Sequence, residues 1–150
     1  MSANQQCPAC GAPWPEGHTC EDDFHQMLFW EAEFPEYGAA VHHLLVVCYF
    51  LQHPHLYSPE GVKEGRRLLS DFLDRGLSPQ KVRQDMRERV ASDKRDWNIS
   101  GKKVPGSYSL PVHWTMRAAD VVAGGSDHYV ESVKAWARSI HQALQTIPNP

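Results

Sequence analysis

The chain has 150 residues, of which 41% are hydrophobic and 22% charged, and its formal net charge is −3. A chain of this length can bury about 68–70% of the surface that it exposes when unfolded, so one core can hold the fold without disulfides. We see no apolar run that approaches the roughly 20 residues needed to cross a bilayer. We also see no charged region followed by an apolar region, the pattern of a secretory signal peptide. We therefore expect one cytoplasmic domain over residues 1–150 rather than a membrane or disulfide-rich secreted protein.

The charges are distributed unevenly along the chain. Residues 1–62 contain eight acidic residues and no Lys or Arg, whereas residues 63–103 contain 12 basic and seven acidic residues. An acidic segment repels the phosphate backbone of nucleic acid. Mixed charges of both signs, as in the middle segment, are typical of a solvated helix face. The charge pattern therefore disfavours nucleic-acid binding.

The N-terminal half predicts an irregular segment followed by a helical hairpin. The first 19 residues contain three prolines and no helical pattern, so this segment needs support, which a metal ion would supply. A capping threonine and three acids open a helix over residues 20–34, which Pro35 stops. After a turn over residues 36–38, residues 39–52 are apolar nearly all round, which indicates a central buried helix. A β-strand is the alternative for this run, but the run is long for a strand.

Caps and helix breakers mark the elements that follow. Ser58 and Pro59 open a third helix, which Gly76 closes. Ser78 and Pro79 repeat this opening, and a thin apolar stripe with spacing four predicts a fourth helix on the surface: Val82, Met86 and Val90. Residues 96–114 contain several Gly and Pro residues and are expected to form a long loop, of a length that is often functional or mobile.

The C-terminal part, residues 115–150, is expected to hold a short helix over 115–122 and a last helix capped by Ser126, with apolar residues every three or four positions up to Ile147. The fold class is thus all-α, with about five helices in a compact bundle. The single domain divides into a metal-binding segment, helices one to four, the loop and the C-terminal part: 1–19, 20–95, 96–114 and 115–150.

The motif Cys7-Pro8-Ala9-Cys10-Gly11 has the pattern of a zinc knuckle. Two thiolates reach one ion from a tight turn, and the glycine after the second frees backbone N–H groups to point at sulfur. A redox role is the second interpretation, but it would place such a motif at a helix N-terminus beside a βαβ unit. The third interpretation is that the thiols have no function. Cys20 is the natural third ligand. Cys48 lies among apolar residues, where a small buried hydrophobe is the favoured interpretation.

The geometry of a helical hairpin suggests the fourth ligand. If the first two helices are antiparallel, residues whose numbers add up to about 73 face each other, which places His53 opposite Cys20. His42 would lie about 16 Å from His53 along the same helix. His18 is the second candidate for the fourth ligand and His25 the third. The alternative for His53 is a structural role at the C-terminus of the helix, where the helix dipole favours a histidine. Three thiolates and one imidazole in a closed shell suit structural Zn²⁺ and leave no coordination position for a substrate.

The same register places Glu31 opposite His42, where a carboxylate and an imidazole would form a hydrogen-bonded pair. Tyr49 follows His42 on the same stripe of the second helix. Buried polar groups are costly unless they have partners. These residues are therefore either a polar network that fixes the core or a site for a substrate or second metal, with Asp120 and His128 as candidate partners.

Several segments can be compared with a known pattern: CPACG at 7–11, Cys20, Glu31, HHLLVVCYFLQHP at 42–54, AADVV at 118–122 and VKAWARSI at 133–140. Together they resemble the bacterial family known as domain of unknown function 5946, over nearly the whole chain. The resemblance singles out the matching positions Cys7, Cys10, Cys20, Glu31, His42, Tyr49, Gln52, His53, Pro54, Asp120 and Trp136. His18 and His25 have no counterpart, and the chain departs from the pattern around Met116 and Arg117. The resemblance implies a compact domain and no particular activity.

Two functions from different classes fit these patterns. The first is a small zinc-stabilised helical protein that binds another protein or a small ligand, and it needs only the Cys3His site. The second is an enzyme in which a polar pocket performs acid–base chemistry or holds a second metal. Its candidate catalytic residues are Glu31, His42 and Tyr49, with Asp120 or His128. Nucleic-acid binding through the knuckle is the least expected function.

Overall fold

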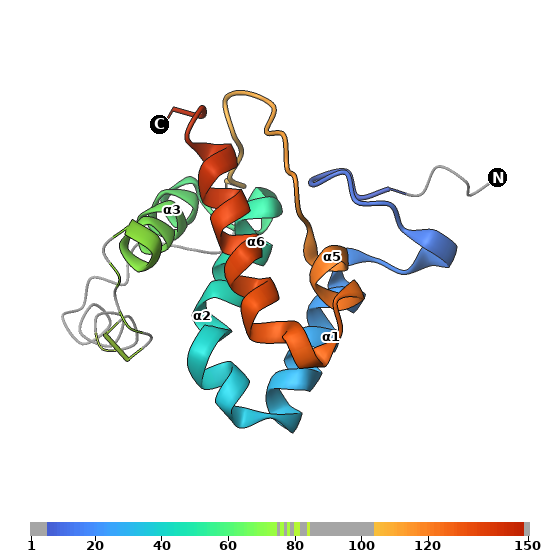
Figure 1. The fold of residues 1–150 in the computed structure, drawn as a ribbon. Coiled ribbons are helices and arrows are strands. Elements are labelled where there is room, and N and C mark those ends of the chain that lie inside the picture. The colour runs from blue at the N-terminus through green and yellow to red at the C-terminus, as the bar shows by residue number, and fades with distance from the viewer. Residues whose placement is uncertain are drawn as a thin grey trace.

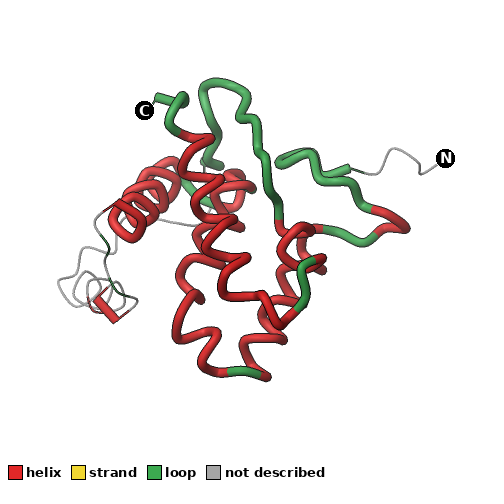
Figure 2. Tube along the Cα trace, viewed as in Figure 1, coloured by secondary structure: helices red, strands yellow, loops and turns green. Residues whose placement is uncertain are grey.

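The computed structural model describes residues 6–74, 76, 78, 80, 81, 84 and 104–148. Within these residues the chain is all-α, as predicted, and its only β-type pairing is an isolated bridge between Gln6 and Pro13. Figures 1 and 2 show the described helices α1 (Cys20–Glu33), α2 (Pro35–Gln52), α3 (Pro59–Asp74), α5 (Ala118–Ala123) and α6 (Tyr129–Leu144). Short 3-10 helices cover Pro15–Gly17, Pro54–Leu56 and Ser126–His128.

The hairpin of α1 and α2 is tighter than the sequence suggested. Thr19 caps α1 through reciprocal hydrogen bonds with Asp22. The expected turn over residues 36–38 is instead helical, because α2 begins at Pro35 and only Phe34 separates the two helices. A proline at the first helical position lacks only an N–H that has no partner there. Pro35 therefore starts α2 as well as ending α1.

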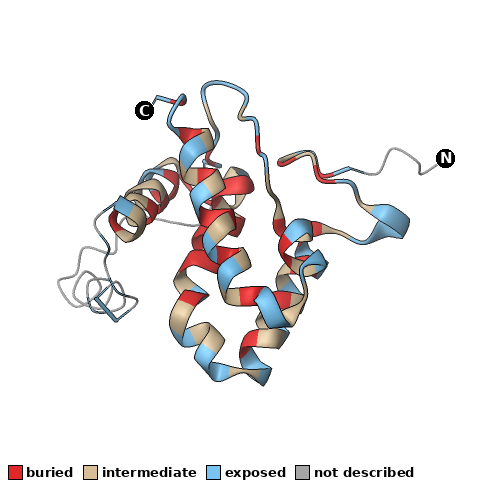
Figure 3. Cartoon of the chain, in the orientation of Figure 1, coloured by how far each residue is buried: buried red, intermediate tan, exposed pale blue. Residues whose placement is uncertain are grey.

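The central position of α2 follows from its apolar sequence. It packs against α1, α3 and α6, and the buried residues in Figure 3 gather where these helices face one another. Leu45, Cys48 and Leu51 of α2 are fully buried, as are Trp136 and Ile140 of α6. Cys48 thus occupies the small apolar position expected of it, and burial raises the pKa of its thiol. None of the described helices combines the length and apolarity needed to cross a bilayer.

The third helix begins and ends as its caps predicted. The Ser58 hydroxyl accepts a hydrogen bond of 3.0 Å from the backbone N–H three residues later, and Pro59 is the first residue of α3. Past its end, Gly76 has a φ of +66°. The predicted fourth helix, from Ser78 to residue 95, falls almost wholly outside the described residues, as do residues 96–103 of the predicted loop.

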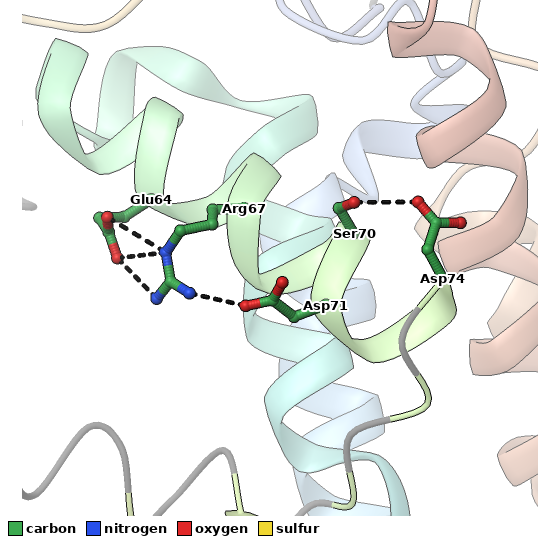
Figure 4. Close-up of polar contacts among 5 residues, drawn as sticks. All are labelled: Glu64, Arg67, Ser70, Asp71 and Asp74. Carbon is green, nitrogen blue, oxygen red and sulfur yellow. Dashed lines mark hydrogen bonds and ion pairs between the residues drawn. The ribbon is translucent and has the colours of Figure 1, made fainter.

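Charged side chains one turn apart on α3 form ion pairs (Figure 4). The guanidinium of Arg67 contacts Glu64 at 3.0 Å, one turn before it, and Asp71 at 2.6 Å, one turn after it. The Ser70 hydroxyl donates to Asp74 at 2.9 Å. Such pairs one turn apart stabilise a helix by about 0.2–0.5 kcal/mol each. α3 is therefore amphipathic, with its apolar face against α2 and α6.

The segment before α5 runs along the C-terminal end of α2 without regular structure. Tyr108 donates its hydroxyl to the carbonyl of Leu51 at 2.5 Å, and the Gly106 N–H donates to the carbonyl of Tyr57 at 2.7 Å. A Cβ on Gly106 would lie 2.8 Å from the carbonyl oxygen of Pro54. Only glycine allows this close approach. The contacts hold the loop against the part of α2 that leads to the cysteine cluster.

The last two helices differ from the prediction at their ends. α5 begins at Ala118 rather than at residue 115, and α6 begins at Tyr129, after a 3-10 turn that includes Ser126. The N-cap positions are occupied by Gly125 for the 3-10 turn and by His128 for α6, rather than by Ser126. α6 ends at Leu144, before Ile147. Tighter 3-10 turns are common at helix ends, where the apolar periodicity does not specify the boundary.

Candidate metal centre

Cys7, Cys10, Cys20 and His53 lie together at the open end of the α1–α2 hairpin. Each residue is at most 5% exposed, and their ligand atoms all lie within 4.8 Å of one another. The cysteines are free, and the sulfurs of Cys10 and Cys20 are 3.6 Å apart. A disulfide would hold them at about 2.05 Å, whereas two sulfurs bound at about 2.3 Å to one tetrahedral Zn²⁺ lie about 3.8 Å apart. The arrangement therefore fits a four-coordinate metal ion.

The first two sulfurs come from one tight turn. The Cys10 N–H points at the Cys7 sulfur, 3.4 Å away, and the Gly11 N–H donates to the Cys7 carbonyl at 2.9 Å. Gly11 has a φ of +80°, a left-handed conformation that costs glycine little. The Cys7 N–H closes the turn by donating to the carbonyl of Ala12 at 2.8 Å. The CPACG motif thus forms a knuckle whose two sulfurs face the same point.

The third sulfur belongs to the first residue of α1, where the helix dipole favours negative charge. The Trp14 indole N–H donates to the Cys20 sulfur at 3.5 Å. The hydrogen bond with Cys10 lowers the pKa of Cys20 to about 4, against the effect of burial, with smaller contributions from His53 and Trp14. The same hydrogen bond and burial raise the pKa of Cys10. A cation bound by both sulfurs would replace this hydrogen bond.

His53 presents one ring nitrogen to the sulfurs. Its Nδ1 lies 2.6 Å from the carbonyl oxygen of Tyr49, and since a carbonyl only accepts, Nδ1 carries the proton. Nε2 therefore holds a lone pair. It is buried and has no hydrogen-bond partner within the part of the chain that the structure describes. An unsatisfied buried acceptor costs about 1–3 kcal/mol, and a metal ion would satisfy it. Histidines that bind a metal through one ring nitrogen commonly donate the N–H of the other nitrogen to a carbonyl or carboxylate oxygen.

The other histidines considered as ligands are not part of the cluster. His18 Nε2 is 2.7 Å from the carboxylate of Asp23, and the His18 side chain is 53% exposed. This hydrogen bond raises the pKa of His18. His25 lies beside Phe24, with ring centroids 6.3 Å apart. Neither belongs to the group of four that the structure brings together.

Arg117 connects the knuckle to α5 and was not foreseen as part of the site. Its Nε donates to the carbonyl of Cys10 at 2.7 Å, and its guanidinium lies against Gly11. Three thiolates around one Zn²⁺ would leave a net charge of about −1, which a neighbouring guanidinium offsets. The only signal in the sequence was that Arg117 falls where the chain departs from the family pattern.

The structure also brings together the second predicted pair. His42 Nδ1 lies 2.6 Å from one carboxylate oxygen of Glu31, and Tyr129 donates its hydroxyl to the other oxygen at 2.5 Å. Glu31 is 8% exposed, whereas the His42 side chain is 47% exposed. Burial and the contact with Glu31 raise the pKa of Tyr129. Tyr129 was missed because it comes from α6, which the register of the first hairpin does not involve.

The remaining candidates for catalysis do not join this pair. Tyr49 lies beside the cysteine cluster, where its ring stacks on Phe24 with centroids 4.4 Å apart. Asp120 accepts a hydrogen bond of 2.9 Å from the backbone N–H of Arg117 and thereby caps α5. His128 is exposed in the 3-10 turn before α6. The polar pocket expected around Glu31, His42 and Tyr49 is therefore not formed by those three side chains.

The comparison with protein families agrees with the sequence motifs. The model of the family of unknown function DUF5946 matches residues 5–145. The chain belongs to this family. Comparisons with curated proteins and with solved structures gave no match. The range matched to DUF5946 includes the four residues of the cluster and both members of the Glu31–His42 pair.

Gln52 and Trp136, two more of the positions that match the DUF5946 pattern, have a structural role in this chain. Gln52 is completely buried at the end of α2. Its side-chain oxygen accepts a hydrogen bond of 3.2 Å from the Trp136 indole, and its nitrogen donates to the carbonyl of Met116 at 2.7 Å. Gln52 thus joins α2 to α6 and to the segment before α5, and satisfies two polar groups that burial would otherwise leave unpaired.

Proposed function

We propose that this protein is a zinc-binding helical module of the cytoplasm, in which Cys7, Cys10, Cys20 and His53 hold one structural Zn²⁺, and that it acts by binding a protein or a small ligand. The observation that carries this proposal is the buried Nε2 of His53, which has no hydrogen-bond partner among the described residues and shares one small volume with three sulfurs. Three thiolates and one imidazole are a ligand set typical of structural zinc. They fill a tetrahedral shell and leave no position for a substrate.

The ion would link parts of the chain that are far apart in the sequence. The knuckle has little regular structure of its own, and Cys20 and His53 begin α1 and end α2 respectively. A metal that binds the folded site and has no preformed site in the unfolded chain contributes its binding free energy to folding. Free cysteines are consistent with a reducing compartment, and the acidic residues 1–62 favour a partner other than nucleic acid.

The decisive experiment is the metal content of pure protein prepared under reducing conditions without chelator. We expect about one zinc per chain in the natural sequence, almost none in Cys10→Ser, and about one in Cys48→Ala. The last variant is the matched control, because Cys48 is equally buried but belongs to the core of α2. Pure, folded natural protein without transition metal, or full zinc in Cys10→Ser, would contradict the proposal.

A second candidate function is supported by the chain of hydrogen bonds from Tyr129 through Glu31 to His42. A histidine oriented by a buried carboxylate is a common form of general base or metal ligand. Two metal ions per chain, or loss of a metal from His42→Ala alone, would favour an enzyme. A folded His42→Ala variant that keeps its full zinc content would favour the binding module.

A further inference from the structure

A groove of about 440 Å³ lies directly against the candidate metal centre. Cys7, Cys20 and His53 contribute to its lining. Four aromatic side chains also line it: Trp14, Phe24, Tyr49 and Phe50. Its volume falls in the range of about 300–1,000 Å³ that is usual for ligand sites. The metal centre thus borders a space that is large enough to receive a side chain or a small molecule.

The charges around this groove favour a cation. All of its lining residues come from residues 1–62, which contain no Lys or Arg. Glu21 contributes a carboxylate to the lining, and three thiolates on one Zn²⁺ would add negative charge beside the groove. Arg117, whose guanidinium offsets that charge at the carbonyl of Cys10, is not among the lining residues. The faces of aromatic rings attract cations, and arginine is found on them more often than lysine. A guanidinium group therefore matches both the rings and the charge.

A second groove, of about 430 Å³, adjoins the first, since His55 lines both. Its walls are mainly apolar and include Pro54, Tyr108, Leu110 and Trp114. Leu110 is 50% exposed and contributes an apolar side chain to this lining. The tip of the knuckle lies between the two grooves, with Pro8 in the lining of the first and Ala9 in that of the second.

We propose that the two grooves bind one extended peptide segment of a partner protein, with an arginine side chain in the groove beside the metal and an apolar side chain in the second groove. Two adjoining spaces of different polarity fit alternate side chains of an extended chain better than one small cation. This inference rests on the proposed function, because the bound metal supplies part of the negative charge and fixes the knuckle between the grooves.

The test is an NMR titration of the zinc-loaded protein, followed through the indole N–H signal of Trp14. The probe is a capped five-residue peptide with one arginine and one leucine, compared with the same peptide carrying neutral citrulline in place of arginine. We expect the arginine peptide to shift the Trp14 signal and the citrulline peptide to bind roughly 3- to 30-fold more weakly. The buried indole of Trp136, bonded to Gln52, serves as the internal reference.

Two variants locate the binding. Glu21→Gln should weaken binding of the arginine peptide several-fold, whereas Glu33→Gln, at the far end of the same helix, should leave it unchanged. Equal affinity for the arginine and citrulline peptides, or equal losses in the two variants, would overturn the proposal. If free arginine amide binds as tightly as the peptide, the grooves recognise arginine alone and the proposal of a peptide is wrong.

The failure of this inference can be separated from that of the proposed function. A zinc-loaded protein without preference for the arginine peptide would overturn the groove proposal and leave the structural zinc intact. A folded protein that lacks zinc would overturn the proposed function, and with it the part of the charge argument that depends on the metal. Metal analysis of the titrated sample distinguishes the two results.

Discussion

Cys20 and His53 face each other across the α1–α2 hairpin, and their ligand atoms lie within 4.8 Å although one begins α1 and the other ends α2. The same register brings Glu31 to 2.6 Å from His42 near the other end of the hairpin. One helical register therefore positions both candidate sites. It also makes the identity of the fourth metal ligand testable.

We expect His53→Ala to lower the affinity for zinc by at least about tenfold, because it removes the nitrogen that shares the volume of the three sulfurs. His18→Ala is the matched control: its imidazole is half-exposed and paired with Asp23, so zinc affinity should not change. Competition against a chromogenic chelator measures both variants. A loss of affinity in His18→Ala with unchanged affinity in His53→Ala would assign the fourth position to His18, the second choice from the sequence.

Removal of the metal should destabilise the fold. We expect a strong chelator to lower the melting temperature of the natural protein by several degrees, because each kcal/mol lost shifts the midpoint by about 2–4 °C in a chain of this size. Thermal unfolding followed by circular dichroism measures the shift. Cys10→Ser should melt at a lower temperature and no longer respond to chelator. A natural protein whose melting is the same with and without chelator would argue against a structural ion.

The hairpin and the cluster could be foreseen because their signals are local. Thr19 and Pro35 mark helix ends through their own backbone chemistry, and apolar residues all round α2 indicate burial without reference to any partner. Once two helices are assigned, an antiparallel register follows from chain order. That register was enough to favour His53 over His18 and His25, although the turn itself proved to be one residue long.

The partners contributed by distant segments could not be foreseen. Tyr129 on Glu31 and Arg117 on the carbonyl of Cys10 come from the C-terminal third of the chain. Their positions depend on how α5 and α6 pack against the first hairpin, and periodicity within one helix does not specify such packing. The same limit explains why Tyr49 was grouped with His42: a shared helical stripe does not show that two side chains reach one pocket.

Tyr129→Phe should destabilise the protein by about 1–3 kcal/mol, because the buried carboxylate of Glu31 would lose one of its hydrogen-bond donors. Unfolding in urea measures the change. Tyr37→Phe is the control, since Tyr37 lies beside Tyr129 but is only partly buried, and it should change stability by less than about 0.5 kcal/mol. Similar losses in both variants would show that the hydrogen bond to Glu31 contributes little.

Gly106→Ala should destabilise the protein by about 1–3 kcal/mol. Its new Cβ would lie 2.6 Å from a methyl group of Val62 and 2.8 Å from the carbonyl oxygen of Pro54, and the backbone contact cannot move independently. At Gly124 the nearest obstacle is the rotatable hydroxyl of Ser132 at 3.2 Å, so Gly124→Ala should have a smaller effect. Urea midpoints compare the two. A Gly106→Ala variant as stable as Gly124→Ala would place Gly106 farther from Pro54 and Val62 than the structure does.

At alkaline pH we expect the buried tyrosines to limit stability. Burial raises the pKa of Tyr57, Tyr108 and Tyr129, for Tyr129 with the help of its contact with Glu31. Because the folded pKa is the higher one, the unfolded chain releases these protons first. The stabilisation is complete below about pH 10 and is lost as the pH rises further, by about 1.4 kcal/mol per pH unit for each tyrosine. Most of the tyrosinate absorbance should therefore appear together with loss of the helical circular dichroism signal, whereas in urea it should appear near pH 10. Tyrosinate forming near pH 10 with the helices intact would show that these hydroxyls are open to solvent.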